Sequence, residues 1–181
     1  MPLAIFRNHE IYLKFLFQIN LSNKTTDVRP KEIKNVLNWI ENNFQLNSVG
    51  YDPYPTSIRL INWIQFVCKY KIEDKNINFS VIEQSKWLSK NLEYHIDANH
   101  LLTNLRCIIY LLNYDKAHEN IFNKSIFYNF FIKELSNQIL EDGGHYERSP
   151  SYHLLILNDL FKLYEFLENR NDTKNYEFKN I

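Results

Sequence analysis

The sequence has no excess of charge of either sign. Lys and Arg together number 21, as do Asp and Glu, so the formal net charge at pH 7 is zero. The basic residues are scattered along the chain, without a basic arm or stripe. Because contacts to phosphates dominate nucleic-acid binding, this balance argues against a nucleic-acid surface. We therefore expect no nucleic-acid partner.

Cysteine is scarce as well. The chain has two, Cys68 and Cys107, and both fall within apolar helical patterns. They are expected to be buried thiols, with a disulfide as the alternative. They do not have the spacing of metal ligands, and no histidine pair has the HExxH arrangement. The sequence predicts neither a metal nor a cofactor.

Long hydrophobic runs are also missing. No segment has the uncharged length needed to cross a membrane, so we expect no membrane span. The apolar N-terminus is interrupted by Arg7, His9, Glu10 and Lys14, and it has no small-residue cleavage site. No export signal is visible, and the localisation stays open.

The abundant residues are those of a globular protein, 45% hydrophobic and 15% aromatic. A length of 181 residues fits one domain with a sizeable core. Apolar side chains recur at helical spacing, and no strand alternation appears. The pattern predicts an all-α protein of antiparallel helical hairpins, with an irregular stretch from Asn42 to Pro55. Four helices are expected over residues 9–20, 78–91, 117–140 and 150–167. Three more are expected to begin at Pro30, after a cap at Thr56 or Ser57, and at about Asp97.

Two of the three glycines, Gly143 and Gly144, stand together in a loop rich in titratable residues. Glycine adopts backbone angles closed to other residues, so the preceding helix can end and the chain can reverse here. Ser149 is then expected as the N-cap of the next helix, with Pro150 as its first residue. Because a helix start favours anionic ligands, this loop indicates a functional site.

Three loop-to-helix junctions put polar side chains beside hydrophobic runs, at 50–63, 93–104 and 142–153. If alternate helices stack side by side, all three junctions open on the same end of the bundle. Aromatic side chains would then line a groove, namely Tyr51, Tyr54, Trp63 and Tyr94. Such a groove suits sugars, because aromatic faces stack on the C–H sides of the ring while polar groups bind hydroxyls and carboxylates.

The stretches GYDPYPTSIRLINW, EYHIDANHLLTNL and EDGGHYERSPSYHLLIL resemble the recurring motifs of the heparinase II/III-like family. Its members are polysaccharide lyases related to alginate and heparin lyases, with an N-terminal α/α toroid and a C-terminal β-sandwich. The three motifs occur here in the family's order and cover residues from about 50 to 160. The resemblance implies that residues 1–181 form a single, partial domain of an incomplete toroid, without the β-sandwich.

The resemblance also implies a reaction, β-elimination at a uronic acid residue. The C5 proton becomes acidic once the neighbouring carboxylate is neutralised, a base removes it, and an acid protonates the departing oxygen. Asn99 and His100 match the family's Asn-His pair, which acts on the carboxylate. Tyr152 matches the tyrosine that protonates the leaving oxygen and, for some substrates, also acts as base. With an ordinary pKa of about 10, Tyr152 would need nearby positive charge for a base role, supplied by Arg148, His145 or His153.

The expected ligand is an acidic polysaccharide, and the side chains expected to bind it are Tyr51, Tyr54, Arg59, Trp63, His145, Glu147, Arg148 and His153. Each candidate also has a structural interpretation. Asn99 suits a helix N-cap, Tyr152 suits a core aromatic, and Arg59 can hold its own loop.

Two other functions stay open. A glycoside hydrolase on a helical toroid needs two carboxylates that face each other across a cleft, whereas Asp142 and Glu147 share one short loop. A non-catalytic carbohydrate-binding remnant or scaffold would keep the aromatic groove alone. An incomplete toroid exposes an apolar edge, for which a C-terminal β-sandwich partner or self-association is the expected cover. The family resemblance suggests a periplasmic or secreted location, with the cytoplasm as the alternative.

Overall fold

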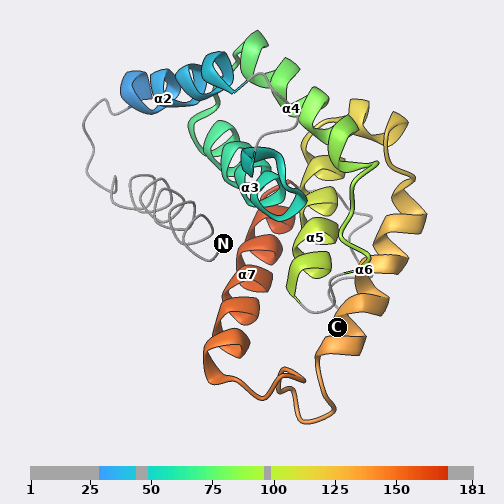
Figure 1. Ribbon diagram of the computed structural model, residues 1–181. Helices are drawn as coiled ribbons and strands as arrows, with labels where there is room; N and C mark the ends of the chain where they lie inside the picture. Colours follow the sequence, from blue (N-terminus) through green and yellow to red (C-terminus); the bar gives the residue numbers. More distant parts are fainter. Residues whose placement is uncertain (1–28, 44–48, 96–98, 171–181) are drawn as a thin grey trace. The chain divides into compact units, whose positions relative to one another are not determined.

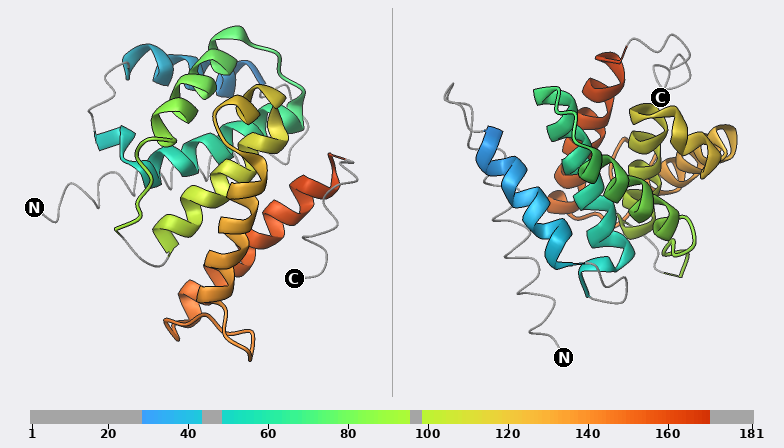
Figure 2. Two further views of the ribbon diagram at one scale, coloured as in Figure 1. Left: turned by 90° about the vertical axis from the view of Figure 1, so that its right-hand side faces the viewer. Right: turned by 90° about the horizontal axis from the view of Figure 1, so that it is seen from above.

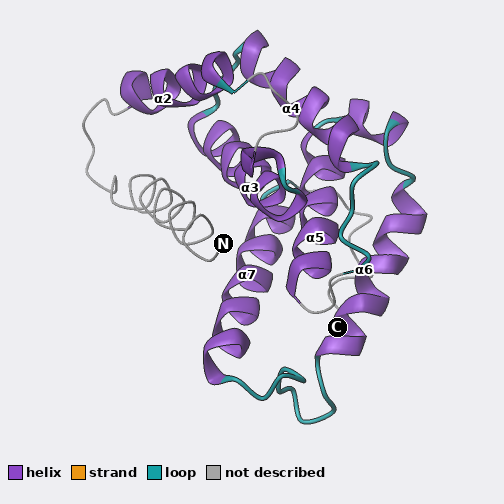
Figure 3. Cartoon of the chain, in the orientation of Figure 1, coloured by secondary structure: helices purple, strands orange, loops and turns teal. Residues whose placement is uncertain are grey.

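The protein is all-α, as the sequence predicts (Figures 1 and 3). The computed structural model describes residues 29–43, 49–95 and 99–170, so the helix expected over 9–20 lies outside the described residues. Within these ranges the only β-type pairing is an isolated bridge between Ile139 and His145. The elements in chain order are α2 (Arg29–Asn42), η1 (Val49–Tyr51), α3 (Pro53–Tyr70), α4 (Lys75–Leu88), α5 (Asn99–Tyr114), η2 (Lys116–Asn120), α6 (Lys124–Gln138) and α7 (Pro150–Glu168).

The chain forms two compact units, one ending at Gln84 and one beginning at Ser85. The N-terminal unit contains α2, η1, α3 and most of α4. Its interior combines buried aliphatic side chains with an edge-to-face contact of Trp39 and Trp63, whose ring centroids lie 5.4 Å apart.

The C-terminal unit is built around α5. Every residue of this helix from Leu101 to Asn113 is buried, because α6 and α7 both pack against it. α6 runs opposite to α5, whereas α7 runs in the same direction as α5 (Figures 1 and 2). The α5–α6 hairpin is therefore antiparallel, and the starts of α5 and α7 lie at the same end of this unit. The α/α toroid that the family resemblance implies stays a prediction.

Helix α7 carries an apolar stripe on its exposed side, in addition to the face that packs against α5. Leu154, Leu157, Phe161 and Tyr164 recur at helical spacing and are all exposed. An exposed apolar stripe of this kind agrees with the expected open edge of a helical assembly. What covers the stripe stays a prediction.

Three predicted helices have other bounds in the structure, and the one expected over 78–91 is α4 at Lys75–Leu88. α3 begins at Pro53, with Asp52 as its N-cap residue, rather than after a cap at Thr56 or Ser57. The Thr56 hydroxyl instead accepts a hydrogen bond from Arg59 Nη2 at 3.0 Å. The helix predicted over 117–140 is divided into η2 and α6, because Asn123 caps a new start by accepting from the Ile126 N–H at 3.1 Å.

His118 in η2 is fully buried, and burial lowers its pKa below the usual 6.5, although Asp115 acts in the opposite direction. The unfolded chain therefore binds more protons just below pH 6.5, so stability should fall as the pH drops below that value. His118→Asn keeps a donor toward the Asp115 carbonyl. It should reduce the slope of the unfolding free energy against pH by up to about 1.4 kcal/mol per pH unit. Urea unfolding between pH 5 and 8 measures the difference, and identical slopes for the two proteins would refute the prediction.

Neither cysteine forms a disulfide, as the favoured interpretation expected, and Cys107 is buried whereas Cys68 is half-buried. Among the described residues, no helix combines the length and apolar character required to cross a bilayer.

Candidate functional site

The start of α5 presents Asn99 and His100, the pair predicted from the second junction. Both side chains are half-buried at the end of a helix whose next thirteen residues are buried. Their polar groups are thus held on a fixed backbone while remaining partly open to solvent.

His100 is paired with a carboxylate that the sequence prediction did not single out. His100 Nδ1 lies 3.2 Å from Glu93 Oε1, and the Glu93 side chain is only 8% exposed against 36% for His100. Glu93 is itself fixed to α5, since its backbone N–H donates to Asn104 Oδ1 at 3.0 Å. Asn104 lies one turn beyond His100 on the same helix. The sequence gives only a weak indication of this pairing, because Glu93 precedes His100 by seven residues across a loop.

The start of α7 forms as predicted. Ser149 is the N-cap and accepts from the Tyr152 N–H at 3.5 Å, and Pro150 is the first helical residue. Tyr152 shares a helix face with the buried Ile156 and Leu163, yet it is 43% exposed because it lies in the first turn. Its side chain is thus open to solvent at the start of the helix.

The glycine loop between α6 and α7 is closed by backbone hydrogen bonds. The Leu140 N–H donates to the Gly144 carbonyl at 2.8 Å, and the Tyr146 N–H donates to the Gln138 carbonyl at 2.9 Å. Gly143 has a φ of 81°, which confirms the need for glycine in this reversal. Asp142 Oδ1 accepts from the Gly144 N–H at 2.9 Å, so this carboxylate supports the turn.

The loop holds its candidate binding residues in different environments. His145 is buried, and its Nε2 donates to Gln138 Oε1 at 3.2 Å, because the Gln138 amide nitrogen already donates to Glu134 at 2.8 Å. Glu147 and Arg148 are exposed, and His153 is half-buried. Arg148 has a φ of 52°, a left-handed conformation that is uncommon for residues other than glycine.

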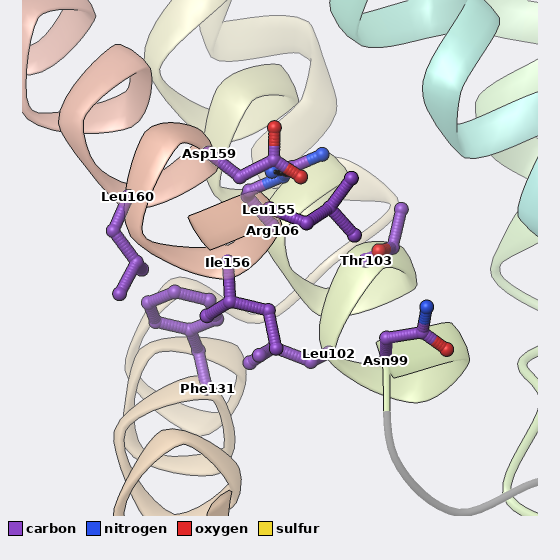
Figure 4. A pocket seen from close by; sticks show the side chains of 9 residues that line it. All are labelled: Asn99, Leu102, Thr103, Arg106, Phe131, Leu155, Ile156, Asp159 and Leu160. Carbon is purple, nitrogen blue, oxygen red and sulfur yellow. Dashed lines mark ion pairs between the residues drawn. The ribbon is translucent and has the colours of Figure 1, made fainter. Parts of the chain in front are cut away.

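A pocket lies where α5, α6 and α7 meet, and Figure 4 shows its walls. Its free volume is about 10 Å³, room for about one water molecule. Arg106 and Asp159 form an ion pair that joins α5 to α7 on one side of the pocket. The residues that line it are Asn99, Leu102, Thr103, Arg106, Phe131, Leu155, Ile156, Asp159 and Leu160.

Of the predicted catalytic residues, Asn99 lines this pocket, and Tyr152 lies one turn before the lining residue Ile156 on α7. Asn99 precedes Arg106 by seven residues, and Tyr152 precedes Asp159 by seven. Seven residues are two helical turns, about 10 Å along each axis. Asn99 and Tyr152 therefore each precede the ion pair by two turns along their own helix, and the two helices run in the same direction (Figure 1).

The first junction lies in the N-terminal unit, where Arg59 is the centre of a packed cluster. Arg59 is 6% exposed and donates to Gln84 Oε1 at 2.8 Å and to the Gly50 carbonyl at 2.6 Å, besides Thr56. Its guanidinium carbon lies 4.1 Å from the ring centroid of Trp39. These contacts satisfy Arg59 within its own unit, which is the structural role that the sequence left as the alternative.

The aromatic candidates of this junction are packed to different extents. Trp63 is buried, and Tyr54 is half-buried in the first turn of α3. Tyr51 is buried, and burial raises its pKa above 10.0 even though Arg59 acts to lower it. The protonated Tyr51 hydroxyl donates to the Asn43 carbonyl at 2.8 Å, so this ring also fixes the loop.

Another aromatic of the predicted groove, Tyr94, is exposed in the C-terminal unit. It is 60% exposed and stacks on Phe130 of α6, with ring centroids 6.0 Å apart and planes within 7°. Tyr94 directly follows Glu93, so an open aromatic face adjoins the segment that holds His100.

Among the described residues, no group of three or more His, Cys, Asp or Glu side chains could hold a metal ion. The described residues thus define an all-α protein whose predicted catalytic residues lie at the starts of α5 and α7. A family model described as Heparinase II/III N-terminus matches residues 56–179, which is more than half of the chain. The protein therefore belongs to this family, which confirms the resemblance found in the motifs. Comparison with curated proteins and with solved structures gave no match.

Proposed function

We propose that this chain acts as a polysaccharide lyase that cleaves uronic-acid-containing polysaccharide by β-elimination. The observation that carries the proposal is the parallel register of α5 and α7. This register is compatible with one sugar unit contacting Asn99 and His100 on α5 and Tyr152 on α7.

Each of the three side chains has a chemical role in the proposal. The Asn99 amide donates to the uronate carboxylate, which lowers the cost of the negative charge that develops when C5 loses its proton. In this proposal His100 accepts that proton instead of assisting Asn99 at the carboxylate, since an imidazole is a suitable base near neutral pH. The C4–O bond breaks, Tyr152 protonates the departing oxygen, and a C4–C5 double bond remains. Water is not consumed.

Substrate binding in the proposal uses the exposed groups around these three residues. The open face of Tyr94 offers a surface for the C–H side of a sugar ring. Arg148 and His153 lie beside the start of α7, where cationic groups suit an acidic polymer. The buried Tyr51, Arg59 and Trp63 act in the proposal as supports of their own loop.

The test is to incubate the purified chain with alginate, hyaluronan, chondroitin and heparan in water enriched in ¹⁸O. We expect the ultraviolet absorbance of an unsaturated uronate to rise with at least one polymer, and the products to contain no ¹⁸O. Incorporation of ¹⁸O at the cleaved bond would refute elimination and indicate a hydrolase. Binding without cleavage would identify a non-catalytic carbohydrate-binding protein, and neither binding nor cleavage would also refute the proposal.

A further inference from the structure

The carboxylate of Glu93 is buried beside His100 in an arrangement that needs a physical reason. The Glu93 side chain is 8% exposed, and its Oε2 is buried with no hydrogen-bond partner among the described residues. Burying a carboxylate costs free energy unless partners replace the water that it loses. The Glu93 carboxylate nevertheless lies against the Nδ1 edge of His100, with a separation of 3.2 Å.

The segment that carries Glu93 is held against α5 by its main chain. The Glu93 N–H donates to Asn104 Oδ1, and Asn104 is fully buried one turn beyond His100. The position of the carboxylate is therefore set by the core of the C-terminal unit and not by a mobile surface contact. This is the geometry of a group that orients its neighbour.

The contact determines which nitrogen of His100 carries the proton. An ionised carboxylate only accepts hydrogen bonds, so Nδ1 must donate to Glu93. In the neutral imidazole the lone pair then lies on Nε2, at the edge of the ring away from Glu93. An imidazole whose one nitrogen is held by a carboxylate has its other nitrogen oriented as a base.

We propose that Glu93 is a positioning residue that holds His100 as the Nδ1–H tautomer, so that Nε2 accepts the C5 proton of the uronate. The assignment of the proton acceptor rests on the proposed elimination, whereas the tautomer does not depend on any substrate. During the reaction the proton moves to Nε2, and the resulting imidazolium stays paired with the Glu93 carboxylate.

The first measurement is the ¹⁵N NMR spectrum of the histidine-labelled chain above pH 8, with the His100 signals assigned by their loss in His100→Asn. We expect the Nδ1–H tautomer in the native chain. Glu93→Gln, whose amide can donate to Nδ1, should shift His100 toward the Nε2–H tautomer. A native chain in which His100 is Nε2–H would overturn the proposal without need of any variant.

The second measurement is turnover on the polymer that the native chain cleaves. Glu93→Gln should lower kcat by about 10–100-fold with KM changed less than about threefold, since positioning affects the reaction step more than binding. Glu93→Asp should recover part of the lost rate. Glu119→Gln, an exposed carboxylate of η2, is the matched control and should leave kcat unchanged.

The two proposals fail in different ways. A tautomer that switches in Glu93→Gln, in a chain that cleaves no uronate polymer, would support the positioning role and refute the elimination. An active chain whose kcat is unaffected by Glu93→Gln would retain the elimination and overturn the positioning role.

Discussion

Replacing Tyr152 by Phe is expected to lower kcat for elimination by about 10²–10⁴-fold, the usual contribution of a positioned proton donor. The change removes one hydroxyl from a side chain that is 43% exposed, and it leaves the aromatic ring in place. The fold should therefore persist. KM should change little, because the proton is delivered only as the glycosidic bond breaks.

The measurement is the initial rate of unsaturated product, together with the thermal midpoint of each protein. Tyr164→Phe is the matched control, because Tyr164 is an exposed tyrosine on the same helix and lies three turns beyond Tyr152. It should retain the native rate. Glu147→Gln distinguishes a hydrolase, which would lose activity through a carboxylate of the glycine loop. A Tyr152→Phe protein that keeps more than a tenth of the native kcat would contradict the assigned role.

Breaking the ion pair of Arg106 and Asp159 is expected to give the largest loss of stability. Arg106 has a side chain that is 6% exposed, against 24% for Asp159. Removing one partner of a buried pair costs about 3–5 kcal/mol, because the other charge is left without compensation. Asp159→Asn should therefore cost more than Arg106→Met, since it leaves the more deeply buried charge unpaired.

Urea unfolding monitored by circular dichroism measures both changes, and hydrogen exchange in α5 and α7 localises them. The double variant Arg106→Met/Asp159→Leu should be close to native stability, because an apolar pair needs no desolvation of charge. Single variants that each lose less than about 1 kcal/mol would show that the pair contributes no more than an exposed salt bridge.

The sequence was sufficient to predict the all-α class and the residue at which α7 starts. Ser149 and Pro150 determine that start locally, because capping and a fixed φ act within one turn. The Gly143 reversal was predictable for the same reason. The start of α3 was predicted wrongly at Thr56, because the hydroxyl of Thr56 is used by Arg59. The break at Asn123 inside the predicted sixth helix was missed, although Asn is a recognised cap.

The motifs indicated which polar residues matter, and the family match confirms the family that they suggested. They did not reveal the partners of those residues. Glu93 reaches His100 only because Asn104 holds its backbone against α5. Arg59 was a candidate for binding substrate, and only the structure showed that its guanidinium donates to Gly50, Thr56 and Gln84.

The sequence by itself thus determined the all-α class, the start of α7, the glycine reversal and the family, because caps, turns and motifs depend on residues a few positions apart. Only the tertiary structure decided that α7 runs parallel to α5, with Arg106 and Asp159 setting the register between them. It also decided that a buried carboxylate faces His100. Both depend on contacts between segments that the linear pattern does not connect, and burial is what makes those contacts strong.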